Sequence, residues 1–290
     1  PLPDPQPFDW RQEPGARVGV ILYRALLSSG DLGLADACAE ALRSQGLCPR
    51  ILMVSGLRSE AIQRAVQHWF SREQVEAVLC GTGFASVKAD EAAAGAPLWR
   101  ELGVPVLQLL SSTGARQRWQ QSSVGLSPLD LAMQVALPEL DGRLTTRIGS
   151  FKELSQADEA LQCAIQRYQP DAEAIGWCAE LTARWIRLRR TPVAQRRVAV
   201  VLANYPTRNA RLANGVGLDT PASAVLLLQW LKDEGLDLGT TALPGSTQAL
   251  IDTLTSGRTP DAESWHLACA DHLPLERYQR LCRQEQQRPR

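Results

Sequence analysis

The sequence predicts an α/β protein, with parallel sheets flanked by helices in two α/β units that a helical segment joins. From Arg17 onward, short apolar runs alternate with amphipathic stretches of helical period, which is typical of βαβ units. The run Arg17–Leu22 recurs as Arg197–Leu202, either as an internal repeat or as a chance likeness of the two expected strands Val18–Tyr23 and Val198–Leu202. Each strand leads through a polar loop into a stretch of helical character that ends at a Gly-Leu pair. We therefore expect a strand-and-helix unit to begin at each of these runs.

Residues 1–150 are expected to form the first α/β domain, with residues 1–15 as a proline-rich arm. Gly46 suits the position just past a helix end. Ser127-Pro128 suits a helix start, with Ser as the N-cap and Pro at the first helical position. The expected strands cover residues 18–23, 51–54, 75–80 and 104–110, and the expected helices cover residues 31–45, 60–70 and a stretch that begins at residue 127.

Residues 151–195 are expected to be a helical connector, and residues 196–290 a second α/β unit that is incomplete. Two helices are expected in the connector, over residues 156–169 and 171–190, because Pro170 separates two stretches of helical character. The first domain and the second unit would then be joined by helices alone.

The composition argues against several classes of protein. Of the 290 residues, 44% are hydrophobic and 21% are charged, as in a globular protein with a hydrophobic core. Lys and Arg number 31, as do Asp and Glu, and this balance argues against an electrostatic nucleic-acid interface. The apolar run Ala222–Leu231 is much shorter than the roughly 20 residues that span a membrane. The seven cysteines include no CxxC pair, which favours a reducing, cytoplasmic setting.

A long polar loop over residues 204–220 is the main candidate for a binding site. It follows the carboxyl end of an expected strand, where open α/β sheets bind their ligands, and it is longer than an ordinary βα connection. Its Arg and Asn side chains can hold carboxylates and amides, and its Tyr can pack on a ring. Asp219 has an alternative and favoured role as a helix N-cap. The candidate binding residues are Asn204, Tyr205, Arg208, Arg211, Asn214 and Asp219.

Three blocks of the sequence are distinctive enough to indicate a family. The first joins Asn204-Tyr205-Pro206 to residues 214–223, Asn-Gly-Val-Gly-Leu-Asp-Thr-Pro-Ala-Ser; the second covers residues 125–142 and the third residues 184–192. Together they resemble the large, tetrapyrrole-binding subunit of aerobic cobaltochelatase over about residues 17–255. The large subunit of magnesium chelatase, from the same family, has a looser version of the first block. Members of the family are several times longer, so the chain resembles a fragment or a shortened relative.

The resemblance implies an activity but not the residues that catalyse it. Large subunits of this kind bind hydrogenobyrinic acid a,c-diamide, receive Co²⁺ as a substrate, and work with AAA+ ATPase chelatase subunits that hold ATP and Mg²⁺. The chain has no Gly-Lys dipeptide, so it lacks a Walker A loop and is not expected to bind ATP itself. Alone, the chain is expected to be inactive. The alternatives are a magnesium chelatase large subunit and a non-catalytic tetrapyrrole-binding or assembly module.

The histidines do not form a recognisable metal site. His266 and His272 lie near Cys269 and Asp271, and these side-chain types can bind late divalent metals. Their spacing matches no common ligand pattern, so ordinary surface chemistry is expected and no resident metal site is assigned.

Two neighbouring carboxylates, Glu139 and Asp141, stand where a helical stretch turns towards residues 144–148. Short acidic side chains often cap helices and support turns. Capping or turn duty is therefore expected for them, rather than acid–base catalysis.

Overall fold

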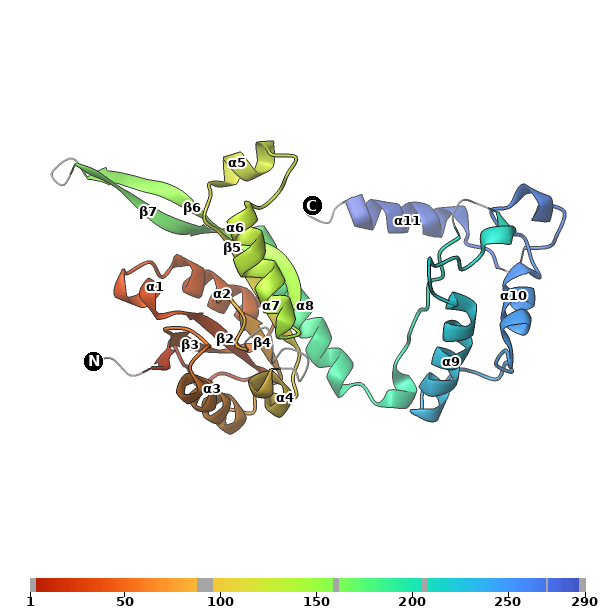
Figure 1. The fold of residues 1–290 in the computed structure, drawn as a ribbon, viewed down its shortest axis with the longest axis horizontal. Helices are drawn as coiled ribbons and strands as arrows, with labels where there is room; N and C mark the ends of the chain where they lie inside the picture. The colour runs from red at the N-terminus through yellow and green to blue at the C-terminus, as the bar shows by residue number, and fades with distance from the viewer. Residues whose placement is uncertain (1–3, 88–95, 159–161, 205–207, 270, 287–290) are drawn as a thin grey trace. The chain divides into compact units, whose positions relative to one another are not determined.

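The computed structural model describes residues 4–87, 96–158, 162–204, 208–269 and 271–286 (Figure 1). The packing of the backbone divides the chain into two compact units, Pro1–Arg189 and Arg190–Arg290. The first unit contains a large sheet with helices on both faces. The second consists of helices and irregular connections.

The sheet of the first unit has seven strands in the order β1-β3-β2-β4-β5-β6-β7. Strands β2 to β6 run parallel, and β1 and β7 pair antiparallel at the two edges. After the edge strand β1, the parallel strands start with β2 inside the sheet, add β3 on one side and then β4, β5 and β6 on the other, which is a doubly wound topology. The predicted parallel α/β fold is therefore confirmed. The strands are β1 Gln6–Phe8, β2 Arg17–Tyr23, β3 Cys48–Val54, β4 Ala77–Cys80, β5 Val106–Ser112, β6 Leu144–Asp158 and β7 Cys163–Pro170.

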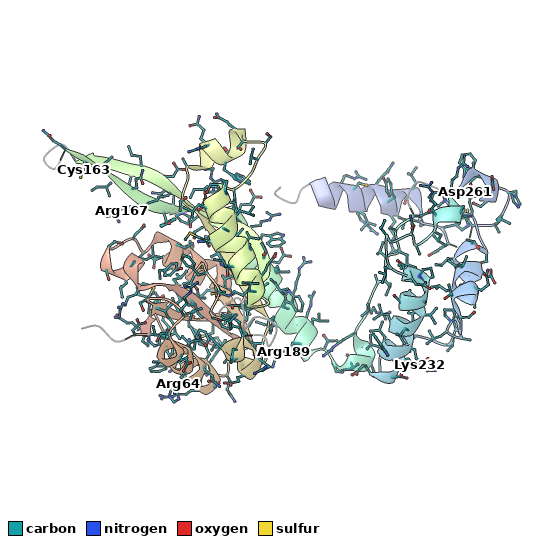
Figure 2. The ribbon with its side chains drawn as sticks, in the orientation of Figure 1. Arg64, Cys163, Arg167, Arg189, Lys232 and Asp261 are labelled. Carbon is teal, nitrogen blue, oxygen red and sulfur yellow. The ribbon has the colours of Figure 1, made fainter. Side chains whose placement is uncertain are left out.

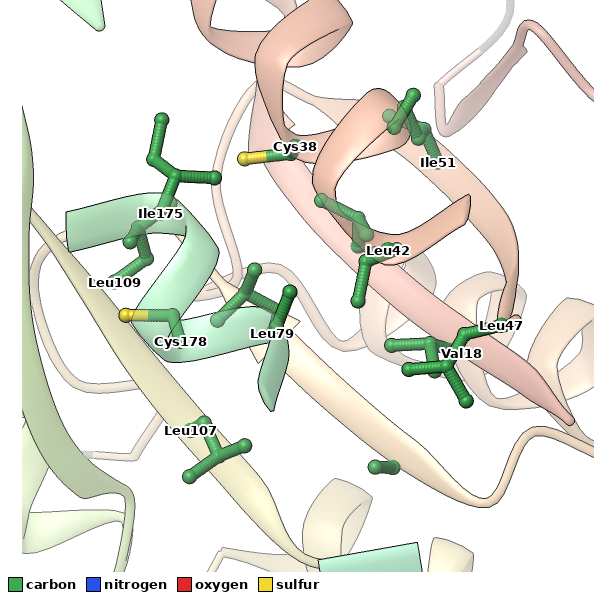
Figure 3. Close-up of a cluster of buried hydrophobic side chains, with 14 of the residues drawn as sticks. Val18, Cys38, Leu42, Leu47, Ile51, Leu79, Leu107, Leu109, Ile175 and Cys178 are labelled. Atoms are coloured by element: carbon green, nitrogen blue, oxygen red, sulfur yellow. The ribbon is translucent and has the colours of Figure 1, made fainter. Parts of the chain in front are cut away.

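Two buried clusters of apolar side chains fix helices to the two faces of this sheet. On one face, Cys38 and Leu42 of α2 and Ile175 and Cys178 of α8 belong to a cluster with side chains of the parallel strands (Figure 3). On the other face, α3 and α4 cover the sheet. The helices of this unit are α1 Arg24–Ser28, α2 Gly33–Ser44, α3 Glu60–Arg72, α4 Pro97–Leu102, α5 Arg116–Gln121, α6 Pro128–Leu131, the π-helix η2 Ala132–Ala136, α7 Leu137–Leu140 and α8 Ala172–Arg190.

The contact between α3 and the sheet depends on a residue without a side chain. Gly19 lies in the middle of β2, and a Cβ atom at that position would lie 2.6 Å from the ring of Phe70. The ring of Phe70 is fully buried against this gap. Burial of such a side chain stabilises the fold by about 1.5–3 kcal/mol. The sequence Val-Gly-Val within β2 therefore determines how closely α3 packs.

The prediction of a helix over residues 156–169 is wrong, because β6 and β7 form an antiparallel hairpin there. The backbone amide of Tyr168 in β7 donates to Asp31 Oδ2 at 2.9 Å. The ammonium of Lys152 in β6 lies 5.9 Å from the centre of the Tyr168 ring. Since β6 is itself held in the main sheet by β5, β7 gains a strand partner, and this pairing overrides the local helical spacing. The predicted helix over residues 171–190 is confirmed as α8.

The second unit contains α9 Thr220–Asp233, α10 Thr247–Thr255 and α11 Leu275–Gln286, with the short 3₁₀ turns η3 Val193–Gln195, η4 Asn209–Arg211 and η5 Ala262–Ser264. The strand expected at Val198–Leu202 is not formed: in the part of the chain that the structure describes, the segment pairs with no other strand. A strand is stabilised by hydrogen bonds to a neighbour, and none of the described residues provides one for this segment. The assignment of residues 196–290 to an incomplete α/β unit stays a prediction.

A buried ion pair ties the start of β6 to the loop that follows β4. The side chains of Asp141 and Arg143 are fully excluded from solvent, and Arg143 Nε donates to Asp141 Oδ2 at 3.0 Å. Asp141 also accepts the backbone amide of Ser86 at 2.8 Å. Arg143 donates to the carbonyl oxygens of Thr82 and Phe84, at 2.9 and 3.0 Å. The described start of the loop, residues 81–87, is therefore fastened to one ion pair at three points.

The same ion pair also contacts the neighbouring elements. Arg143 Nη1 donates to Gln108 Oε1 in β5 at 3.1 Å, and the guanidinium lies 5.5 Å from the centre of the Trp99 ring in α4. Buried charges are tolerated when they are paired and hydrogen-bonded in this way. Asp141 thus has a structural role, which agrees with the expectation that it supports the turn before β6.

We expect replacement of Asp141 by Ala to lower the free energy of unfolding of the first unit by about 3–5 kcal/mol. The change leaves the charge of Arg143 buried without its counter-ion. Urea denaturation followed by circular dichroism measures the loss. Glu139→Ala is the matched control, because Glu139 is a carboxylate two residues away that is not buried. A loss no larger than that of the control would show that the ion pair does not hold the loop.

Candidate functional site

The carboxyl ends of the parallel strands lie at one edge of the sheet in the first unit. The strand order changes direction between β2 and β4, which is where open α/β sheets commonly bind ligands. Tyr23 ends β2 at this point, and its hydroxyl donates to the carbonyl oxygen of Gly83 at 3.3 Å. Burial, and next the nearby Cys80, raise the pKa of Tyr23, so the phenol stays protonated and keeps its donor. This hydrogen bond joins the end of β2 to the loop after β4, at the point where the strand order changes direction.

A hollow of about 350 Å³ lies beyond the carboxyl end of β5. Its walls come from residues 112–115, from α5 and from the loop between α5 and α6. Asp130 also lines it, is 2% exposed and accepts from Thr113 N at 3.0 Å, from Thr113 Oγ1 at 2.9 Å and from Ser112 Oγ at 3.2 Å. Ser127 caps the helix that carries Asp130, because Ser127 Oγ accepts from the Asp130 amide at 3.1 Å. Asp130 therefore shapes the wall of the hollow through contacts with its own chain.

Helix α5 lines this hollow and is held by contacts to β6 and to Asp171, the residue that follows β7. The Arg116 amide donates to Glu153 Oε1 at 2.7 Å, and its guanidinium pairs with Asp171. Trp119 packs against the Phe151 ring, with centroids 5.6 Å apart. Trp119 lines the hollow together with Arg118 and several serine and threonine hydroxyl groups. Such a lining can hold a ligand that combines a flat apolar part with a carboxylate.

Sequence reasoning did not predict this hollow as a site. Two signals for it are present in the sequence. Ser112, Thr113 and Gly114 follow the apolar run of β5, and the distinctive block 125–142 supplies the opposite wall. Neither signal shows that the two segments meet, since the contact depends on the fold.

The loop predicted from the sequence lies in the second unit. Asn204 forms an isolated bridge with Leu212, and its side-chain Oδ1 is buried without a hydrogen-bond partner among the described residues. Tyr205 lies outside the described residues. An acceptor without a partner at this point in the loop can receive an N–H group from a ligand.

Arg208 and Arg211 lie at the start and the end of the turn η4, and both are exposed. The Arg211 amide donates to the Arg208 carbonyl at 3.0 Å, and the Asn214 amide donates to the Arg211 carbonyl at 3.2 Å. The backbone therefore brings Arg208, Arg211 and Asn214 together in two successive turns. The two predicted cations are close in the chain and open to solvent.

The end of the loop is a tight turn followed by a helix cap. Gly215 and Leu218 form an isolated bridge, and Gly217 adopts a φ of +73°, which glycine tolerates best. Val216 stands fully exposed at the tip. Asp219 Oδ1 accepts from the Ala222 amide at 3.0 Å, so Asp219 is the N-cap of α9. This contact agrees with the capping role favoured from the sequence.

A segment that the sequence did not single out anchors the loop. The Asn209 amide donates to Asp261 Oδ2 at 2.8 Å, and Thr259 Oγ1 donates to Asn209 Oδ1 at 2.9 Å. Ser264 Oγ accepts from the Thr259 amide at 2.8 Å and thereby closes this anchor segment. Asp261 is labelled in Figure 2. The one sequence signal for it is that Asp261 is suited to cap the short helix η5.

Within the described residues, no cluster of three or more His, Cys, Asp or Glu side chains is arranged to hold a metal ion. Cys269 is exposed, and all seven cysteines are free thiols. No helix in the described part of the chain has both the length and the apolar character needed to cross a bilayer.

The chain matches the family described as CobN/Magnesium Chelatase over residues 6–290, and it belongs to that family. The aerobic cobaltochelatase subunit CobN of Pseudomonas aeruginosa is 40% identical over 262 residues, which is 90% of this chain and 21% of that protein. A magnesium-chelatase subunit of Cereibacter sphaeroides is 28% identical over 282 residues, 88% of this chain and 23% of that protein. The family resemblance drawn from the three sequence blocks is thereby confirmed.

A solved structure agrees with this assignment. The catalytic subunit of cobaltochelatase from Mycobacterium tuberculosis matches with a TM-score of 0.73 at 32% identity, over 88% of this chain and 22% of that chain. The chain thus spans about a fifth of the length of the relatives it matches. These matches confirm the α/β fold and the relation to cobaltochelatase.

We expect the anchor of the 204–220 loop to weaken in acid. The pKa of Asp261 lies below its usual value of 3.8, chiefly because the carboxylate accepts from the backbone amides of Asn209 and Glu263. Since the folded-state pKa is lowered, this stabilisation is present above the unfolded-state pKa and is lost as the pH falls through the folded value. The amide chemical shift of Asn209, followed by NMR, should titrate with a midpoint below 3.8.

Two variants separate this titration from others nearby. Asp261→Asn should abolish it, whereas Glu263→Gln, a change at an exposed neighbour, should leave it in place. A midpoint at or above 3.8 would contradict the anchoring role of Asp261.

Proposed function

We propose that the chain is part of the tetrapyrrole-binding large subunit of a cobaltochelatase. In this proposal the large subunit binds hydrogenobyrinic acid a,c-diamide and Co²⁺, and AAA+ ATPase partner subunits hold ATP and Mg²⁺. The observation that carries the proposal is the difference in identity, 40% to the cobaltochelatase subunit of Pseudomonas aeruginosa and 28% to the magnesium-chelatase subunit of Cereibacter sphaeroides. The distinctive string Asn214–Asp219 supports the same choice.

Metal insertion into such a macrocycle requires three changes. Co²⁺ must lose bound water, the ring must distort, and the ring nitrogens must lose their protons. We assign the 204–220 loop to holding the macrocycle by its periphery. Arg208 and Arg211 suit the peripheral carboxylates through charge-assisted hydrogen bonds, and Asn214 suits a carboxylate or an amide. Tyr205 would pack on the ring and keep its hydroxyl in water.

The other two residues of the predicted set take different roles in this proposal. Asn204 offers the acceptor Oδ1, which has no hydrogen-bond partner among the described residues and suits an amide N–H of the diamide. Asp219 uses its carboxylate to cap α9, and a carboxylate facing the substrate would repel the substrate's own carboxylates. We therefore assign Asp219 to fixing the exit of the loop. No residue is assigned as the base that removes the ring protons.

Energy for the reaction would come from other subunits. The chain contains no Gly-Lys dipeptide, and a Walker A loop needs that Lys to reach the β- and γ-phosphates. The seven free cysteines are in keeping with a reducing compartment, and we propose the cytoplasm.

Two chimeras test the choice of metal. In each, this chain replaces the matching fifth of a relative, either the cobaltochelatase subunit of Pseudomonas aeruginosa or the magnesium-chelatase subunit of Cereibacter sphaeroides. We expect the cobaltochelatase chimera, with its own ATPase partners, to insert Co²⁺, because the loop that holds the macrocycle is retained. The magnesium-chelatase chimera and the chain alone should show no insertion. Absorbance of the metallated macrocycle measures each reaction.

The reverse result, activity in the magnesium-chelatase chimera alone, would favour the magnesium alternative. A cobaltochelatase chimera that binds the macrocycle without inserting metal would favour a non-catalytic binding module.

Replacing both Arg208 and Arg211 by Ala in the cobaltochelatase chimera should weaken macrocycle binding by about tenfold, which corresponds to about 1.4 kcal/mol. Well-formed charge-assisted bonds contribute about 1.5–3 kcal/mol each, and exposure to water reduces that value. Absorbance titration gives the dissociation constant. The matched control is the double change Arg277→Ala and Arg280→Ala, which removes the same charge from exposed positions of α11.

Unchanged affinity, with metal insertion also intact, would refute the binding role of the loop. If circular dichroism instead shows lost folding, the loop packs against the rest of the large subunit. The control pair should alter neither affinity nor folding.

A further inference from the structure

The second unit buries little apolar surface. Among the described residues, its buried apolar side chains are Ala213, Ala224 and Leu250, whereas the first unit has two extensive buried clusters. Large apolar side chains are exposed instead, with Val201 at 89% and Trp230 at 57%. A helix as apolar as α9, which contains Ala-Val-Leu-Leu-Leu, is normally buried on all sides. This unit therefore presents surface that another part of a protein covers.

The segment Val198–Leu202 has the composition of a strand that is covered on both faces, Val-Ala-Val-Val-Leu. In the part of the chain that the structure describes, its backbone forms no ladder with another segment. Val198, Val200 and Leu202 line a hollow, whereas the residue between the last two, Val201, is exposed and does not. Alternation of this kind has the period of a β-strand.

The hollow beside this segment has a volume of about 690 Å³, and its lining is mainly aliphatic. Helix α9 contributes Ala224, Leu228 and Leu231, which recur at helical spacing on one face. Helix α10 contributes Leu250 and Leu254. Figure 1 locates both helices in the second unit. An aliphatic hollow of this size would be unfavourable if it were left to water.

The residues after α9 also line the hollow without forming a strand, as Val198–Leu202 do. Leu236 and Leu238 line the hollow, and residues 236–238 form no strand. In the first unit, the step from β2 through α2 leads into β3, which pairs with β2 along seven residues. The second unit thus has the order of a βαβ unit without its sheet.

We infer that this hollow and the unpaired backbone of Val198–Leu202 receive a β-strand from a part of the large subunit outside these 290 residues. The chain covers only 21% and 22% of two relatives, so proteins of that length have ample chain to supply the strand. The backbone of that strand would satisfy the unpaired N–H and C=O groups. Its alternate side chains would fill the hollow. The inference rests on family membership and on neither the metal nor the macrocycle.

Hydrogen exchange measured by mass spectrometry tests the inference, with the chain alone compared with the cobaltochelatase chimera. The amides of residues 199–202 should exchange at nearly unprotected rates in the chain alone. In the chimera they should exchange about tenfold more slowly or slower still, because paired strands open rarely. Equal rates in the two proteins would overturn the inference. Protection of these amides in the chain alone would also overturn the inference. Protection independent of protein concentration would show that the chain fills its own hollow, and protection that rises with concentration would show that a second copy fills it.

Two variants of the chimera then test the hollow itself. Leu228→Lys places a charge among the lining residues and should restore fast exchange at residues 199–202. Gln229→Lys places the same charge at the next, exposed position of α9 and should leave the protection unchanged. Equal effects of the two changes would overturn the role of the hollow. Because the exchange readout needs no metal, a chimera that keeps the protection but fails to insert cobalt would refute the proposed function alone.

Discussion

The ion pair between Asp141 and Arg143 determines how the carboxyl edge of the sheet can be arranged. Removing two charges from water is costly unless each charge finds close partners, and the partners here are backbone groups of the β4 loop. Movement of that loop would uncover a buried charge. The described start of the loop, residues 81–87, is therefore held in place beside the switch point, where Tyr23 meets Gly83. The hollow beyond β5 lies outside this network and depends instead on Asp130.

The parts of the fold that were predicted well are those in which a short apolar run of the sequence is enough to indicate a buried element. The continuous apolar run Val18–Tyr23 forms β2 because both faces of a covered parallel sheet exclude water. Residues 156–169 have helical spacing, yet their described parts, residues 156–158 and 163–169, lie in β6 and β7, which pair with each other. For Val198–Leu202 the error is the reverse: its composition predicts a strand, but it forms none, because the described residues offer it no strand partner. Apolar pattern predicts burial, but pairing depends on distant residues.

The candidate site follows the same rule. The cap at Asp219 could be anticipated because its acceptor and its donor at Ala222 are three residues apart. The bond from Asn209 to Asp261 joins residues 52 positions apart, and no local pattern connects them. The hollow beside Asp130 was likewise hidden, because its two walls come together only when β5 and α6 are in place.

The buried cysteines of the first unit have a consequence for the handling of metal ions. Cys38 and Cys178 lie in the cluster between α2, α8 and the sheet (Figure 3). Burial raises the pKa of both thiols, so they remain protonated at neutral pH. Metal ions bind the thiolate form of cysteine rather than the thiol. These two buried, protonated sulfurs are therefore unavailable to any metal ion that reaches the first unit.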